Sequence, residues 1–222
     1  MKVTLISSPN FHGASSSSGK RARPDQLQGT DAERLAEYAG RKCYDSFGRG
    51  RDSAAFAENI LEHGHVNVLY HAWFSLDIEG VSRNLTHELV RHHVGFSPSM
   101  RSTRYCYEGA SKTVEHPVLR GLERTEAHAK AEAAFDRAWR EAYDHTIQAL
   151  VAAGHDKKTA HGAAARYLPN GIETSLVWSG NIAAFRSLLE RRSIEGVVDA
   201  EFVELCAAMR EVLRPLAPAY FG

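Results

Sequence analysis

The chain has 222 residues, of which 43% are hydrophobic, enough for a buried core in one domain or two small ones and too many for a disordered chain. Its 27 Lys and Arg residues balance 27 Asp and Glu residues. This zero net charge argues against a general binder of nucleic-acid polymers or membrane surfaces, because such proteins carry a basic excess.

The first part of the chain predicts one strand and two helices. Residues 1–8 have the apolar character of a strand and are too short for a signal peptide. Residues 12–25 are rich in Ser and Gly and then in basic residues, which predicts a flexible loop. Residues 31–44 and 53–64 predict helices, and Ser53 is the expected N-cap of the second one.

The next part predicts a strand, a helix and a loop. Residues 70–80 place apolar side chains at every second position, as a half-buried strand does. Residues 81–93 repeat apolar side chains at positions i, i+4 and i+8, which favours a helix. The residues from Arg91 to His93 therefore fall at the end of this helix. The Gly, Ser and Pro residues that follow predict a loop over 95–101.

The remaining elements are mostly helices. We expect, in chain order, a long helix over 125–153, a shorter helix that ends at Leu168, a strand over 172–178, a helix over 181–192 and a last helix over 199–213. No internal repeat or linker interrupts them. The sequence thus predicts an α+β fold in which residues 1–222 form a single domain, with a mixed or antiparallel central sheet flanked by long helices.

The cysteine pattern and the lack of a long apolar run indicate where the protein works. The three cysteines, Cys43, Cys106 and Cys206, have no CxxC pairing and are too few for a disulfide framework. No apolar run reaches the roughly 18 residues of a membrane-spanning helix. We therefore expect a reduced, cytoplasmic protein that does not contact a membrane.

The histidine spacing argues against a metal site. In the segment HELVRH, His87 and His92 are five residues apart and point about 140° from each other on a helix, whereas the HExxH motif of zinc proteases needs a spacing of four. His63, His65 and His71 have no carboxylate or cysteine at ligand spacing. We expect no metal, and a metallohydrolase is the least favoured function.

Arginines dominate the segment RHHVGFSPSMRSTRY. Arg91, Arg101 and Arg104 can grip a phosphate or a planar carbonyl-bearing ring through paired N–H donors. The same spacing also fits solvated loop residues, and both interpretations stay open. Arg192 follows Asn181 by eleven residues, about three helical turns, so both share one face. This second cluster favours ligand binding, although Asn181 alone is typical of a helix N-cap.

Four motifs together resemble the flavin-dependent thymidylate synthase (ThyX) family. The family signature is Arg-His-Arg, then seven or eight residues, then Ser-x-Arg-Tyr; here it corresponds to Arg91–His93, eight residues, and Ser102–Tyr105. The GHxxxxxH motif of the family corresponds to residues 64–71. Its LPNxTETxxxxTGN-type segment corresponds to residues 168–181, and the arginine eleven residues later corresponds to Arg192.

The resemblance implies a reaction and its co-reactants. It implies FAD as the cofactor, NADPH as the reductant and 5,10-methylenetetrahydrofolate as the one-carbon donor. The substrate that it implies is a uridine 5′-monophosphate, dUMP or UMP, which is methylated at C5 of the uracil. The family also implies a homotetramer whose active sites lie between subunits.

The resemblance also implies a set of site residues. Arg192 is expected to stabilise the anionic pyrimidine, and Ser102 is expected to be positioned near the reacting base. The implied substrate-binding residues are Glu88, Arg91, Met100, Arg101, Ser102, Thr103, Arg104, Arg166 and Arg192. The implied flavin-contacting residues are Cys43, His65, Asn67, Arg91, His92, His93, Asn181 and Ser187.

Five positions depart from the family pattern. His93 stands in place of the third signature Arg, Met100 in place of an acidic or polar residue, Ala183 in place of an Arg that touches FAD, and Gly196 in place of a His. Arg166 lies three residues before the Pro of the LPN segment, whereas the family Arg lies four before it. These changes predict weaker FAD binding, or binding through other groups.

The departures leave two finer questions about function. The longer loop over 96–101 predicts room beside the sugar, so that UMP is accepted as well as dUMP; such an enzyme resembles the UMP/dUMP methylase of polyoxin-type nucleoside antibiotic pathways. The alternative is a flavin- or nucleotide-binding homologue that has lost catalysis, given His93, Ala183 and Gly196. Release of tritium from C5 of the uracil distinguishes the two.

Overall fold

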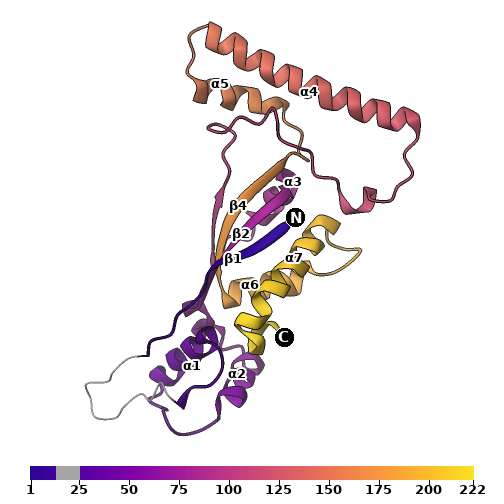
Figure 1. The fold of residues 1–222 in the computed structure, drawn as a ribbon. Helices are drawn as coiled ribbons and strands as arrows, with labels where there is room; N and C mark the ends of the chain where they lie inside the picture. Colours follow the sequence, from indigo (N-terminus) through magenta and orange to yellow (C-terminus); the bar gives the residue numbers. More distant parts are fainter. Residues whose placement is uncertain (14–25) are drawn as a thin grey trace. The chain divides into compact units, whose positions relative to one another are not determined.

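The computed structural model describes residues 1–13 and 26–222 (Figure 1). Most of the flexible loop predicted over 12–25 therefore lies outside the described residues. The contacts divide the chain into two compact units. Unit 1 comprises Met1–Ile78, Arg91–Pro98 and Val177–Gly222, and unit 2 comprises Glu79–Val90 and Ser99–Leu176. That residues 1–222 form a single domain stays a prediction.

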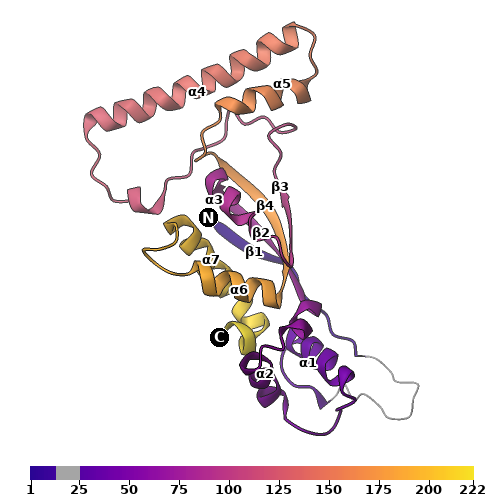
Figure 2. The ribbon, with the colours of Figure 1, turned by 180° about the vertical axis from the view of Figure 1, so that it is seen from behind.

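A four-stranded antiparallel sheet confirms the predicted α+β class. Its strands lie in the order β1-β2-β4-β3 (Figure 2) and are β1 (Lys2–Ser7), β2 (Trp73–Ser82), β3 (Phe96–Met100) and β4 (Glu173–Asn181). The first, second and fourth of these confirm strands predicted from the apolar pattern.

The loop predicted over 95–101 is wrong, because β3 occupies most of it. The Phe96 ring lies 5.0 Å from the rings of both Trp178 and Phe185. This aromatic contact provides the packing that holds the start of the segment in the sheet. At the other end, the N–H of Arg101 donates to the carbonyl of Ser175 at 3.0 Å.

The core of unit 1 lies between the sheet and two helices, α6 (Ile182–Arg192) and α7 (Ala200–Leu213). Phe74, Leu76 and Ile78 alternate along β2 and are each 0% exposed, which confirms the predicted strand periodicity. Phe185 of α6 and Phe202 of α7 are also 0% exposed. Both helices confirm predictions.

Unit 1 also holds α1 (Asp31–Cys43), α2 (Ser53–Glu62), the 3₁₀ helix η2 (Val66–His71) and the short C-terminal helix α8 (Pro218–Phe221). The N-cap expected at Ser53 is wrong by one residue. The carboxylate of Asp52 accepts the N–H of Ala55 at 2.9 Å, and Ser53 is the first helical residue.

Unit 2 contains α3 (Arg83–Leu89), the long helix α4 (Glu126–Ala152) and α5 (Lys157–Ala164). The helix predicted over 81–93 is shorter, because Ser82 ends β2 and caps α3 by accepting the N–H of Leu85 at 3.0 Å. Helix α4 confirms its prediction. Trp139 and Tyr143 of α4 pack with residues of α5 and the chain before β4 to form a small core.

Cys206 lies in the core of unit 1, where it is 0% exposed, and burial raises the pKa of its thiol to about 11. Between pH 9 and 11 the unfolded chain releases this proton while the folded chain keeps it. We therefore expect the free energy of unfolding to fall by about 1.4 kcal/mol per pH unit across this window from Cys206 alone.

Denaturant unfolding of the wild type and of Cys206→Ala at pH 8, 9, 10 and 11 measures this effect. Burial also raises the pKa of Tyr220, so both proteins lose stability at high pH. The slope of the wild type is expected to be steeper. Equal slopes in the two proteins would contradict the prediction.

Candidate functional site

A cavity of about 710 Å³ in unit 1 gathers most of the expected flavin-contacting residues. We call it the α6 pocket, because helix α6 forms one wall. Five of the expected residues line it, namely Arg91, His92, His93, Asn181 and Ser187. The segment 91–96 that follows α3 provides a second wall, and residues of η2 and of the start of β2 provide a third.

Asn181 joins two walls of the α6 pocket and is 5% exposed. Its side-chain oxygen accepts the N–H of Ala184 at 2.9 Å, so it is the N-cap of α6. Its own N–H donates to the carbonyl of Gly95 at 3.2 Å. The N-cap role predicted for Asn181 is thus confirmed, and the same residue fixes the distance between α6 and the segment after α3.

Gly95 is needed at this junction for two reasons. Its φ of +76° is a conformation that residues with a Cβ avoid. A Cβ at position 95 would also lie 2.8 Å from Asn181 Nδ2 and 2.9 Å from Ala184 Cβ. We expect Gly95→Ala to lower the free energy of unfolding by about 3 kcal/mol, through backbone strain of about 1–2 kcal/mol and overpacking of about 1–3 kcal/mol.

A second glycine of unit 1 provides the matched control for this prediction. Gly50 has φ +83°, and a Cβ there would meet no atom within 4 Å. Gly50→Ala therefore carries the backbone strain without the clash. Urea unfolding should show a larger loss of unfolding free energy for Gly95→Ala than for Gly50→Ala. Similar losses for both variants would contradict the predicted clash between a Cβ at position 95 and the side chain of Asn181.

The surface of the α6 pocket combines aromatic rings with cations. Tyr70 and Trp73 line it and are 51% and 43% exposed. Arg186 and Arg191 of α6 also line it, and Arg186 forms an ion pair of 2.7 Å with Glu190. Neither arginine was among the flavin-contacting residues expected from the sequence. The sequence did contain a hint of Arg186. The family has an arginine at position 183, where this chain has Ala183, and Arg186 lies one helical turn further on and on the same face of the helix.

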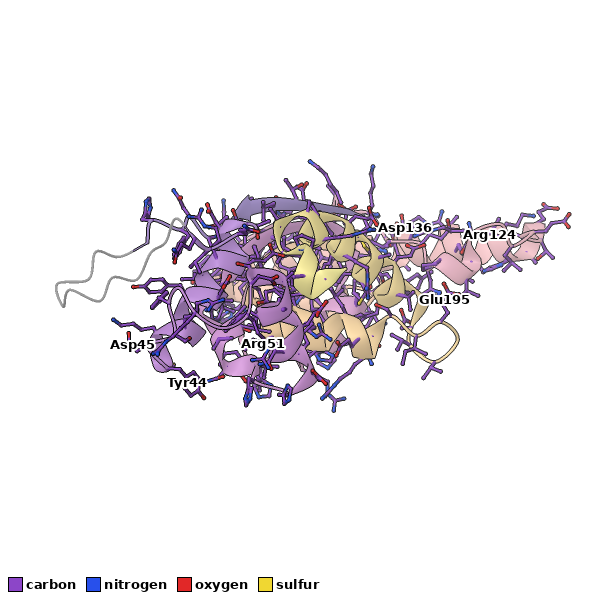
Figure 3. All side chains as sticks on the ribbon, turned by 90° about the horizontal axis from the view of Figure 1, so that it is seen from below. Tyr44, Asp45, Arg51, Arg124, Asp136 and Glu195 are labelled. Atoms are coloured by element: carbon purple, nitrogen blue, oxygen red, sulfur yellow. The ribbon has the colours of Figure 1, made fainter. Side chains whose placement is uncertain are left out.

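Three of the expected flavin-contacting residues do not line the α6 pocket. His65 precedes η2, and its ring stacks on that of His63 at 6.0 Å. Asn67 is exposed on η2, between pocket-lining Val66 and Tyr70. Cys43 is exposed at the end of α1, before the turn where Figure 3 shows Tyr44 and Asp45 projecting outward. Flavin contact by these three stays a prediction.

Arg192, the expected catalytic residue, is the last residue of α6. Its guanidinium carbon Cζ lies 4.4 Å from the centre of the Phe202 ring. The ring of His92 also meets the Phe202 ring, at 5.8 Å between centres and at 62°. The structure thus brings Arg192 and His92 to one buried aromatic residue, which sequence periodicity marked only as part of a helix.

In unit 2, two smaller cavities hold several of the expected substrate-binding residues. One of about 300 Å³ is lined by Thr103 and Arg166, and one of about 280 Å³ is lined by Met100. Both cavities share Arg83 and Asn170. Arg83 was not a candidate in the sequence, and it is a second arginine in the lining of the cavity that holds Arg166. Paired arginines of this kind suit a phosphate.

The turn that begins at Ser102 carries the end of the arginine signature. The hydroxyl of Ser102 accepts the N–H of Arg104 at 3.3 Å, and its carbonyl accepts the N–H of Cys106 at 2.9 Å. The side chain of Arg104 lies against Gly162, which lines the same cavity as Arg166. Ser102 thus shapes the turn that directs Arg104 towards this cavity.

Arg101 has a protein partner, although its side chain is 42% exposed. Its Nε donates to the carboxylate of Glu108 at 3.0 Å, and Glu108 is 3% exposed. The other Glu108 oxygen accepts the hydroxyl of Ser111 at 2.6 Å, and the N–H of Glu108 donates to Tyr143 Oη at 3.1 Å. Arg101 therefore holds its own loop in place. Glu88 is half-buried on α3 and lines neither cavity.

The described residues contain neither a candidate metal cluster nor a candidate membrane-spanning helix. Within residues 1–13 and 26–222, no three His, Cys, Asp or Glu side chains gather closely enough to hold a metal ion. In the same part of the chain, no helix is both long and apolar enough to cross a bilayer. What the units do offer is an aromatic and cationic pocket in unit 1 and arginine-lined cavities in unit 2.

Comparison with known proteins identifies the family. A family profile described as "Thymidylate synthase complementing protein" matches residues 27–219. The chain is 38% identical over 217 positions to the flavin-dependent thymidylate synthase of Mycobacterium sp. (strain JLS), covering 90% of this chain and 84% of the relative. It is 37% identical over 236 positions to that of Mycobacterium marinum, covering 100% and 89%.

A solved structure of a ThyX protein has a similar fold. The crystal structure of ThyX from Helicobacter pylori with FAD and dUMP has a TM-score of 0.62 and 20% identity, and it covers 100% of this chain and 97% of that one. This likeness supports the fold. Since the profile spans most of the chain and the relatives are aligned over almost their whole length, the chain belongs to the flavin-dependent thymidylate synthase family.

Proposed function

We propose that the protein methylates C5 of a uridine 5′-monophosphate, with FAD as cofactor, 5,10-methylenetetrahydrofolate as one-carbon donor and NADPH as reductant. The observation that carries this proposal is the α6 pocket, which gathers five expected flavin-contacting residues from two distant segments of the chain. The Helicobacter pylori relative was solved with FAD and dUMP, which supports the same pair of ligands here.

The α6 pocket fits FAD in size and chemistry. Its volume of about 710 Å³ lies in the range of cofactor sites. Tyr70 and Trp73 offer aromatic surface to the isoalloxazine ring, and Arg91 and Arg191 offer cations to the pyrophosphate. When bound and reduced, FAD supplies the hydride that converts the transferred one-carbon unit to a methyl group.

The substrate phosphate suits the arginines of unit 2. Arg166 and Arg83 line one cavity, and Thr103 adds a hydroxyl there. Arg104 lies beside Gly162 of the same cavity. A phosphate accepts several N–H and O–H donors at once, so this set matches its chemistry. Substrate contacts by Glu88, Met100 and Arg101 remain part of the proposal.

Arg192 has the chemistry that the uracil ring requires. C5 of uracil is a weak nucleophile until charge builds up on the ring carbonyls. A guanidinium that faces the pyrimidine edge stabilises this charge as the new bond to C5 forms. The proton on C5 then leaves, and the folate is released as tetrahydrofolate. Ser102 contributes through the turn that it shapes.

We further propose that the enzyme is a cytoplasmic homotetramer with active sites between subunits. Val118, Leu122 and Phe135 of unit 2 are 70%, 52% and 59% exposed. Such apolar exposure is typical of surfaces that meet another chain. Analytical ultracentrifugation of the full chain is expected to give four copies, and a monomer at micromolar concentration would oppose this part of the proposal.

Tritium release tests the activity directly. The protein is incubated with FAD, NADPH, methylenetetrahydrofolate and either dUMP or UMP labelled with tritium at C5. Release of label into water supports methylation, and release from both nucleotides supports the relaxed UMP/dUMP enzyme. Strict rejection of UMP would leave dUMP as the only substrate and exclude the link to polyoxin-type pathways.

The alternative function is a flavin- or nucleotide-binding homologue without catalysis. Ala183 and His93 favour it, because both line the α6 pocket where the family has arginines. Such a protein would take up FAD, seen as a yellow preparation, and would retain the tritium label on both nucleotides.

A further inference from the structure

A buried aromatic ring lies directly under the arginine proposed to act on the uracil. Arg192 ends α6, Phe202 lies in the first turn of α7, and the two helices lie next to each other (Figure 1). The loop that joins them is exposed, with Glu195 at its outer side (Figure 3). Phe202 is 0% exposed, and its ring centre is 4.4 Å from Arg192 Cζ.

The contact with the Phe202 ring is strong enough to favour one orientation of the Arg192 side chain. A guanidinium over an aromatic ring gains about 0.5–2 kcal/mol, depending on how far it is desolvated. Free rotation of an arginine side chain carries about 2 kcal/mol of rotamer entropy. Since the two terms are similar in size, the ring can compensate for much of the cost of holding Arg192 in one orientation.

The Phe202 ring orients the guanidinium without adding charge to the site. It carries no net charge, whereas the residue that holds Arg101 in unit 2, Glu108, is a carboxylate. The contribution of Phe202 is therefore to the direction of the Arg192 side chain.

The ring itself is held from another side. His92 meets it edge to face, with 5.8 Å between ring centres. Phe202 therefore contacts both a residue of the α6 pocket and the residue proposed for catalysis. The three side chains come from the segment after α3, the end of α6 and the start of α7.

We propose that Phe202 is a positioning residue for Arg192 in the C5-methylation, an inference that rests on the proposed function. It acts through the guanidinium and makes no contact with the nucleotide. Weakening the π-electron density of the ring, at nearly constant size, should therefore lower the rate of methylation while leaving FAD uptake unchanged.

A fluorination series tests this dependence. Phenylalanine at position 202 is replaced in the full chain by its 4-fluoro, 3,5-difluoro and 3,4,5-trifluoro analogues. We expect kcat for tritium release to fall stepwise, reaching about a three- to tenfold loss for the trifluoro ring. The KM for the nucleotide and the FAD content should stay within about twofold of the wild type, since Phe202 lines neither the α6 pocket nor the two cavities of unit 2.

Two controls distinguish an effect of Phe202 on the orientation of Arg192 from an effect on the packing of the core. Phe74 is also 0% exposed, and its neighbour is another ring, Phe221, at 6.2 Å; the same series there should leave kcat unchanged. In an Arg192→Ala background, the series at position 202 should no longer change the residual rate. Equal losses at positions 74 and 202, or a loss that persists without Arg192, would overturn the proposal.

Chemical labelling of Arg192 provides a readout that does not need turnover. Phenylglyoxal must reach the guanidinium, and the Phe202 ring, 4.4 Å from its carbon Cζ, shields that side. We expect Arg192, followed by peptide mass spectrometry, to react about three- to tenfold faster in the trifluoro protein. If the wild type shows no tritium release but labelling follows the series, the proposed function fails while the contact stands. An unchanged rate of labelling across the series would show that the Phe202 ring does not hold the Arg192 guanidinium.

Discussion

Replacing Arg192 with alanine is expected to lower kcat for tritium release by about 10²–10³-fold, with FAD content close to that of the wild type. The physical reason is that a preorganised cation facing a developing negative charge contributes more in the transition state than in the ground state. Arg192 does not line the α6 pocket, so flavin uptake should survive its removal.

Arg192→Lys refines this prediction. Lysine keeps the charge but loses the planar fork of N–H donors, so most of the activity should remain lost. Arg214→Ala is the matched control, because Arg214 is an exposed arginine at the end of the neighbouring helix α7. Turnover of Arg192→Ala within about threefold of that of Arg214→Ala would remove Arg192 from the mechanism.

Removing Glu108 is expected to give the largest loss of stability in unit 2. Glu108→Ala leaves the Arg101 guanidinium without its buried carboxylate and ends the hydrogen bond to Ser111. Breaking a buried ion pair from one side costs about 3–5 kcal/mol. Because Arg101 is itself partly exposed, we expect the lower value, about 3 kcal/mol, in urea unfolding.

Glu115 provides the exposed counterpart for this measurement. It pairs with Arg124 in the same unit, and the two side chains are 44% and 34% exposed. Glu115→Ala should therefore cost less than about 1 kcal/mol. If Glu108→Ala cost no more than Glu115→Ala, the ion pair with Arg101 would not contribute to stability.

The spacing of apolar residues along the chain predicted most of the helices and strands. The long helix α4 and the strand β2 follow from spacing alone, because apolar side chains at periods of 3.6 and 2 residues can be buried only in these conformations. The segment 95–101 was assigned to a loop because Gly, Ser and Pro favour turns. It forms a strand because Phe96 finds Trp178 and Phe185, which lie more than eighty residues away in the sequence.

The sequence by itself determined the family and the chemical character of the site, because motif order and spacing are properties of the chain alone. Arg101 and Arg192 were both expected to bind the substrate, and Arg192 was also expected to act on the uracil. Only the tertiary structure showed what holds each of them: Arg101 meets the buried carboxylate of Glu108, and Arg192 meets the ring of Phe202. Motif spacing could not predict these neighbours, because folding decides which side chains are buried beside each arginine.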